Sequence, residues 1–138
     1  MQHLASSPAA RASALRAGLL ALAAVQLVQG LLLAFAPGAF YDAVANFGAR
    51  NDHDLRDMAA FYLASAAILA LAVSRPSWRA PVLAVVGLQY GLHALNHLLD
   101  AGKADPSWVG PFDAVSLLAG TALIAVLLRT ALRPEERS

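Results

Sequence analysis

Long apolar stretches dominate the pattern of hydrophobic and polar positions along the chain. Four of them stand out, at residues 12–36, 58–74, 80–99 and 114–128. A helix needs about 20 predominantly apolar residues to cross the hydrocarbon core of a membrane. The first and third stretches are this long, and the second and fourth become so when their flanking turns are included. No stretch alternates with a period of two, which argues against a membrane β-barrel. The pattern therefore predicts four transmembrane helices.

Proline and glycine clusters separate these stretches and mark the expected helix ends. We expect helices at about residues 12–36, 56–74, 79–99 and 112–132, within one transmembrane domain at residues 11–133. Residues 1–10 are expected to form a disordered cytoplasmic tail, and residues 134–138 a second short tail. The first stretch also resembles a signal sequence, but it is longer than a signal core and Pro37 follows the would-be cleavage site. We therefore expect an uncleaved helix.

The basic residues predict the orientation of these helices. If the chain crosses four times, seven of the ten Lys and Arg residues fall on the side of the two termini. Basic residues concentrate in cytoplasmic loops, so both termini are predicted to be cytoplasmic. All seven aspartates then lie on the outer side. Trp78 and Trp108 are expected to anchor opposite membrane faces.

Composition agrees with a membrane protein and excludes several functions. The 138 residues are 59% hydrophobic and only 14% charged, whereas soluble domains carry about 25% charged residues. The mean hydropathy is +0.57. The absence of cysteine excludes disulfides, thiolate metal sites and thiol redox catalysis. The net charge of +1, without a basic stripe, argues against a nucleic-acid partner. We predict an all-α integral membrane four-helix bundle with both termini inside.

A polar stripe at the outer end of the third helix is the main candidate for function. Its members are spaced four, three, one and three residues apart, which places them on one helix face: Gln89, His93, Asn96, His97 and Asp100. Lipid would not tolerate such a face, so we expect it to point into the bundle. Gln26 and Gln29 of the first helix are expected to form hydrogen bonds between helices.

Two histidines four residues apart on a helix can bind one metal ion. The candidate ligands for zinc, iron or manganese are His53, Asp57, His93, His97, Asp100 and Asp113. In a catalytic site, His93 or His97 would be the ligand or general base, and Asp57 would orient it. The alternative is structural: these polar groups would only bond to one another and to carbonyl groups, and so fix the bundle. The residues identify no other cofactor.

These motifs also resemble a known group of proteins. Three short motifs carry the resemblance. These are Asn51-x-His53-x-x-Arg56-Asp57, then Tyr62-Leu63 in an apolar helix, and then the stripe from His93 to Asp100. In these motifs the chain resembles small uncharacterised membrane proteins of the broad DoxX-like group. The resemblance covers residues 15–130. It implies a four-helix bundle in the inner, cytoplasmic membrane of a bacterium, and it brings no established activity.

Three functions fit the sequence. The first is a metal-dependent or acid–base site that opens outward and acts on a lipidic or quinone-like molecule. The second is a non-catalytic accessory subunit, in which glycine-rich faces pack on a membrane-protein partner or a second copy of the chain. The third is a small transporter or channel. It ranks last, because the polar stripe ends about halfway along the third helix.

Overall fold

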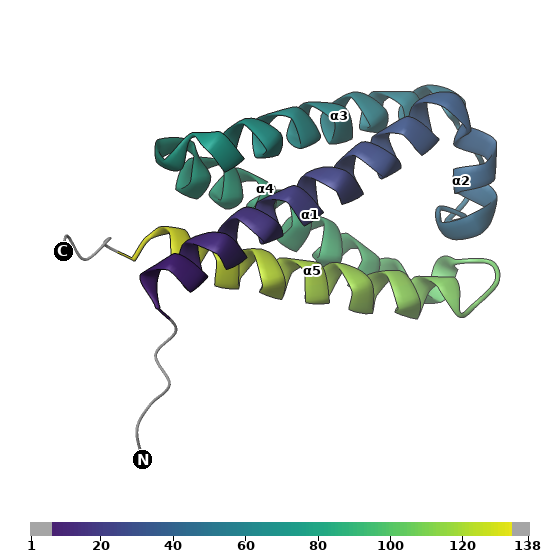
Figure 1. Cartoon of the computed structure of the whole chain (residues 1–138). Coiled ribbons are helices and arrows are strands. Elements are labelled where there is room, and N and C mark those ends of the chain that lie inside the picture. Colours follow the sequence, from purple (N-terminus) through teal and green to yellow (C-terminus); the bar gives the residue numbers. More distant parts are fainter. Residues whose placement is uncertain (1–6, 134–138) are drawn as a thin grey trace, which may run out of the picture.

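The computed structural model describes residues 7–133, and in this part of the chain every regular element is a helix (Figure 1). In chain order the elements are α1 (Pro8–Phe35), α2 (Pro37–Val44), α3 (Asp52–Ser74), α4 (Pro76–Asp100), the 3₁₀ turn η1 (Ala101–Lys103) and α5 (Val109–Ala131). The all-α prediction is therefore confirmed for the described residues, and α2 is an additional helix that was not predicted. The tails expected at residues 1–6 and 134–138 lie outside the described residues.

Four of these helices, α1, α3, α4 and α5, are long and apolar enough to cross a membrane. At 1.5 Å per residue, the 23 residues of α3 extend about 35 Å, which exceeds the roughly 30 Å hydrocarbon core. Only 17% to 33% of the most apolar window of each helix is buried within the protein, so most of its side chains face outward. Such helices imply a lipid bilayer around a multi-pass membrane protein.

Capping residues start α1 and α3 several positions before their apolar stretches. The Ser7 hydroxyl accepts a hydrogen bond from the Ala10 amide, and Pro8 occupies the first turn, so α1 begins at Pro8 rather than near residue 12. The Asn51 side chain accepts from the His53 amide and starts α3 at Asp52. Helix starts placed by hydropathy therefore come too late, because the capping residues are polar.

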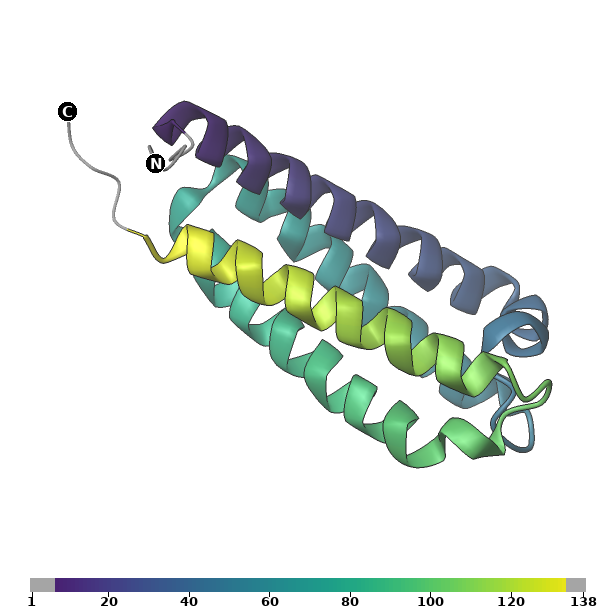
Figure 2. The same ribbon diagram turned by 90° about the horizontal axis from the view of Figure 1, so that it is seen from below.

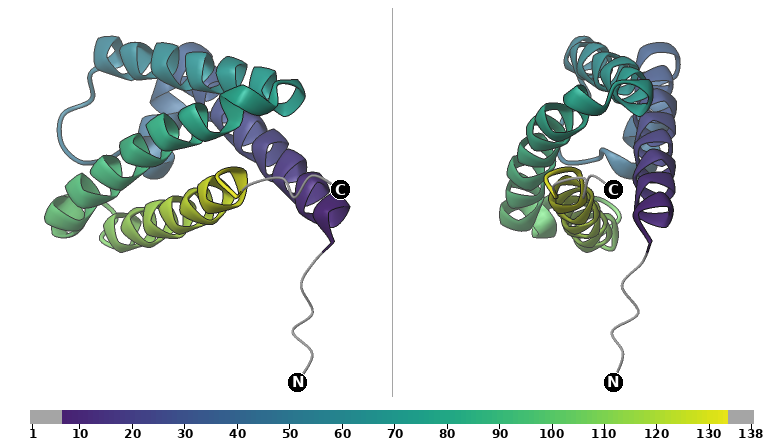
Figure 3. Two further views of the ribbon diagram at one scale, coloured as in Figure 1. Left: turned by 90° about the vertical axis from the view of Figure 1, so that its left-hand side faces the viewer. Right: turned by 60° about the vertical axis from the view of Figure 1, so that its left-hand side comes forward.

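The four long helices form two tightly packed pairs. α1 lies along α3 and α4 lies along α5, whereas α3 packs less extensively on α4 and α1 touches α5 in only a few places (Figure 2). A glycine permits the close approach within the first pair, because a Cβ atom added at Gly30 would lie 2.8 Å from the Leu63 side chain. Figure 3 shows the two pairs diverging toward the end of the bundle that carries α2.

Core side chains fill only one half of the bundle. We call the end where α1 begins and α5 ends the terminal end, and the opposite one the α2 end. In the terminal half, each long helix contributes a side chain with no exposed surface: Leu19, Leu69, Leu83 and Ile124. Near the α2 end, the buried cluster around Leu33 comes from α1 and α3 alone, with α2 packed against it. The centre between the pairs is therefore closed in one half and unfilled in the other.

α2 and the loop after it bridge the diverging pairs (Figure 1). Phe40 and Tyr41 of α2 pack on the buried cluster of α1 and α3. Beyond α2, the Asn46 carbonyl accepts a hydrogen bond of 3.1 Å from the Asp105 amide in the connection between α4 and α5. Residues 37–50 thus connect to both pairs, and we call this segment the lid.

The contact between α4 and α5 at the α2 end yields a stability prediction. A Cβ atom at Gly110 would overlap the carbonyl group of Ala101, which is backbone and cannot rotate away. We expect Gly110→Ala to lower the free energy of unfolding by about 1–3 kcal/mol, because α5 must move away from η1. A reduced thermal midpoint in detergent would report this loss. Gly102→Ala is the matched control, since its Cβ would meet nothing within 4 Å. Equal midpoints for the two variants would contradict the contact.

Candidate functional site

A cavity of about 1170 Å³ lies between the two helix pairs, in the half of the bundle nearer α2. The four long helices, α2 and the loop after α2 all contribute to its walls. It forms where the pairs diverge and no core side chain fills the centre. Pockets for small molecules typically measure about 300–1,000 Å³, so this cavity is large enough for one.

The polar wall of the cavity comes from α4. The predicted stripe lines it in full: Gln89, His93, Asn96, His97 and Asp100. Gln89, His93, His97 and Asp100 are half-buried, whereas Asn96 is exposed, so the stripe borders the interior of the bundle only in part. Helical spacing accounts for the arrangement, since residues three and four apart lie above one another on one face.

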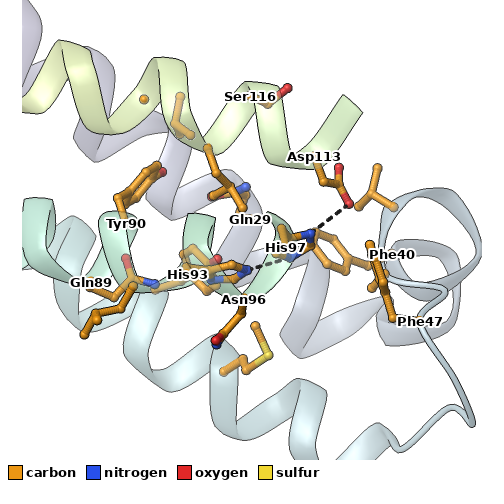
Figure 4. Close-up of a pocket in the computed structure, with 18 of the residues that line it drawn as sticks. Gln29, Phe40, Phe47, Gln89, Tyr90, His93, Asn96, His97, Asp113 and Ser116 are labelled. Atoms are coloured by element: carbon orange, nitrogen blue, oxygen red, sulfur yellow. Dashed lines mark hydrogen bonds and ion pairs between the residues drawn. The ribbon is translucent and has the colours of Figure 1, made fainter. Parts of the chain in front are cut away.

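His93 and His97 are in direct contact within this wall (Figure 4). Their rings are stacked, with centroids 4.8 Å apart and planes inclined by 18°. The two Nε2 atoms are 2.9 Å apart, which is a hydrogen-bond distance. One Nε2 must therefore carry a hydrogen atom while the other accepts it. The histidine pair can hold a proton between the rings or direct both nitrogen atoms at a common ligand.

Asp113 of α5 adds a carboxylate on the other side of His97. Its Oδ2 atom lies 3.8 Å from His97 Nδ1, and the two side chains are only 13% and 18% exposed. This distance allows charge attraction but is too long for a hydrogen bond, so Nδ1 has no hydrogen-bond partner among the described residues. We call these three residues the His93–His97–Asp113 row.

Two glutamines add polar atoms that lack partners. Gln29 of α1 and Gln89 of α4 line the cavity, and the Oε1 atom of each is buried without a hydrogen bond to any described residue. Buried polar atoms in proteins are nearly always paired. Gln26 is fully buried and makes none of the interhelical hydrogen bonds expected of it. Gln29 and Gln89 therefore present two free acceptor atoms to a polar group bound in the cavity, which Gln26 does not line.

The lid covers the histidine pair at the α2 end. The Phe47 ring meets His97 edge-on, with centroids 4.8 Å apart and planes at 83°. Figure 4 shows Phe40 beside Phe47 at the same end of the cavity. The Tyr41 hydroxyl contacts Asn46 Oδ1 at 2.8 Å and also the Gly48 carbonyl, which folds the loop back onto α2. These aromatic side chains shield His97 from water.

An exposed ion pair closes the lid segment. Arg50 Nε donates a hydrogen bond of 2.5 Å to the Asp52 carboxylate at the start of α3. This hydrogen bond raises the pKa of the Arg50 guanidinium above its ordinary value. Exposed pairs contribute little to stability, so the aromatic contacts are the main attachment of the lid.

The remaining walls are apolar and reach the outer surface of the bundle. Val85, Leu88 and Leu92 of α4 and Met58 of α3 line the cavity and are also exposed. Such residues mark an opening of the cavity between α3 and α4, and Val25 of α1 and Leu123 of α5, which also line the cavity and are exposed, mark a second one between α1 and α5. In a bilayer both openings face hydrocarbon.

The other candidate ligands lie apart from the histidine pair. His53 and Asp57 pair with each other at 3.6 Å, with side chains 83% and 72% exposed, and neither lines the cavity. Asp100 lies at the cavity margin and pairs with Lys103 at 2.7 Å. Within residues 7–133, no group of three His, Cys, Asp or Glu side chains is arranged to hold a metal ion. Of the six candidate ligands, the structure brings together His93, His97 and Asp113.

Sequence reasoning missed the residues of the lid. Phe40 and Phe47 were not among the candidates, because the segment after Pro37 read as a connecting loop. A signal was present: Pro37 can open a helix, and Phe40, Tyr41 and Val44 follow at helical spacing. The contact of Phe47 with His97 had no such signal, since it depends on how the loop folds.

Residues 14–129, more than half of the chain, match the family described as "Domain of unknown function (DUF4345)". No curated protein matches the chain, and no solved structure matches it.

The attachment of the lid yields a prediction about its motion. Tyr41→Phe removes the hydroxyl contacts to Asn46 and Gly48, and we expect a net loss of about 1 kcal/mol for this interaction. Hydrogen exchange of the amides at residues 44–50 should become about fivefold faster, because local opening becomes more frequent. Tyr90→Phe, which removes a hydroxyl from α4, should leave this exchange unchanged. Unaltered exchange in Tyr41→Phe would show that the hydroxyl does not hold the lid.

Proposed function

The chain belongs to the DUF4345 family, whose function is unknown, and we propose its function from the site itself. We propose a small multi-pass membrane protein that binds an amphiphilic molecule, lipidic or quinone-like, and holds the polar group of that molecule at the His93–His97–Asp113 row. One observation carries this proposal. The row stands at the polar end of a cavity whose other walls are apolar and open toward lipid.

The chemistry of the row supports acid–base work on the bound group. His97 would accept or donate the proton, because an imidazole can serve as either acid or base and this one contacts a second imidazole at Nε2. Asp113 would take the orienting role that the sequence suggested for Asp57, since it faces the far nitrogen of His97. Gln29 and Gln89 would position the ligand through their free carbonyl oxygens.

The proposed location follows the charge distribution. We propose that the terminal end faces the cytoplasm, because the basic residues concentrate there. The α2 end and the cavity would then face the outer side. A bacterial cytoplasmic membrane, and a place within the broad DoxX-like group, remain proposals from the resemblance of the motifs.

Binding fits the packing better than transport does. The terminal half of the bundle is filled by side chains from all four long helices, including Leu19 and Leu83, which have no exposed surface. A polar solute would have to displace this core to cross the protein. The cavity is therefore better suited to holding a molecule that arrives through the bilayer.

Removing the polar anchors should release the ligand. We expect His97→Ala and Asp113→Asn to lower the amount of co-purifying amphiphile by about tenfold, since a hydrogen bond to a charged group contributes about 1.5–3 kcal/mol. Organic extraction of the purified protein, followed by mass spectrometry, measures this amount per chain.

The same substitutions at the exposed pair make the comparison specific. His53→Ala and Asp57→Asn change the same residue types outside the cavity, and both should retain the amphiphile. Equal retention in all four variants would refute the proposed binding site. If His53→Ala and Asp57→Asn instead lost the amphiphile, the result would favour a site that includes the wider set of residues predicted from the sequence.

A metal-dependent form of the same site is the second candidate. It is favoured by the facing Nε2 atoms of His93 and His97, because imidazole nitrogen is a preferred ligand of zinc, iron and manganese. Asp113 would then stand behind His97, as carboxylates often do behind metal-binding histidines. The remaining ligands would come from the bound molecule or from water.

Metal analysis separates the two forms. The metal-dependent form predicts about one zinc, iron or manganese ion per purified chain, lost in both His93→Ala and His97→Ala. Elemental analysis by mass spectrometry measures this content. Content at background in the unmodified protein would eliminate the metal form and leave the acid–base form in place.

A further inference from the structure

A second groove lies on the lipid-facing side of the seam between α3 and α4. It encloses about 410 Å³, and its walls are almost entirely apolar. The residues that line it are Ile68 of α3 and Ser77, Trp78, Pro81, Val82 and Val85 of α4. The groove lies toward the terminal end, over the part of the core that contains Val82.

Val85 belongs to both the groove and the cavity. α3 and α4 pack less extensively on each other than on their own partners. Met58 and Leu92 line the cavity on this side, and the groove begins at Val85 and runs toward Trp78. The two spaces thus adjoin at Val85, and together they extend along α4 from the histidine pair to Trp78.

The length of this path restricts what can fill it. Fifteen residues of helix separate His93 from Trp78, which corresponds to about 22 Å at 1.5 Å per residue. Half of the hydrocarbon core is about 15 Å thick, so the path extends beyond one leaflet. Both tails of a phospholipid stay within one leaflet, so a path that passes the bilayer midplane suits a ligand with a single long chain better.

We infer that the ligand of the proposed site has a single long apolar tail, which leaves the cavity over Val85 and lies in the α3–α4 groove as far as Trp78. This inference rests on the proposed function and adds the class of ligand: a one-tailed amphiphile with a polar head. The Arg75 guanidinium, 5.6 Å from the centre of the Trp78 ring, places the end of the groove at the membrane interface. The groove would select ligands by shape and length, because a tail gains little hydrophobic energy on leaving lipid.

Photo-crosslinking in lipid nanodiscs tests the inference. Two probes are used, both derivatives of hexadecanol: one has a diazirine beside the hydroxyl group, and the other has it at the far end of the chain. The head probe should label the stretch of α4 between residues 89 and 97. The tail probe should label residues 68–82, and excess unlabelled hexadecanol should suppress this labelling.

Blocking the groove supplies the decisive variants. Val85→Trp, at the junction, should lower tail-probe labelling of the groove by about tenfold, the factor that corresponds to 1.4 kcal/mol of overpacking. Ile68 lines the groove and not the cavity, so Ile68→Trp should lower tail-probe labelling and leave head-probe labelling in place. Val126→Trp is the matched control, because Val85 and Val126 are both 59% exposed and Val126 lies on α5. Ile68→Trp blocks the groove from its other wall and should repeat the effect if Val85→Trp disturbs folding.

The outcomes distinguish the two proposals. Head-probe labelling of the cavity, with tail-probe labelling spread over all lipid-facing helices and insensitive to competitor, would overturn the single-tail inference and leave the proposed site standing. The proposed site itself would be overturned if the head probe failed to label residues 89–97, or if excess unlabelled hexadecanol did not reduce that labelling.

Discussion

The need to keep the polar face of α4 out of hydrocarbon shapes the rest of this bundle. Unpaired amide and imidazole groups are costly in lipid, so Gln89, His93 and His97 must point between the helices. These residues occupy the half of α4 near its C-terminal end, whereas the other half carries apolar residues such as Leu83 on its inward face. One half of the bundle can therefore close around a core, and the other half opens around a polar wall.

Uneven packing between the helices gives this cavity its means of access. The pairs α1–α3 and α4–α5 are held by extensive contacts and by close approaches such as that at Gly30. The seam between α3 and α4 and the lid have fewer contacts, so movement there would not disturb either pair. The parts of the fold that can open are thus the parts that border the cavity.

The cavity combines a polar end with apolar walls that face lipid. At the α2 end, the Phe47 ring covers His97, which contacts His93 on one side and faces the Asp113 carboxylate on the other. Along the seam, exposed apolar side chains face lipid directly. A molecule with a polar head and an apolar body matches both environments at once. This match, rather than the histidine motif alone, favours an amphiphilic ligand.

The sequence by itself determined the helical class, the four apolar spans and the grouping of polar residues on one stripe of α4, because hydropathy and helical periodicity are local properties. Only the tertiary structure decided which carboxylate joins the histidines. Asp57 lies near the start of α3 and Asp113 near the start of α5, so both were equal candidates. The C-terminal end of α4 packs against the start of α5, so Asp113 faces His97. Asp57 instead turns outward and pairs with His53. Apolar helix faces in lipid are too alike for a sequence to specify which of them pair.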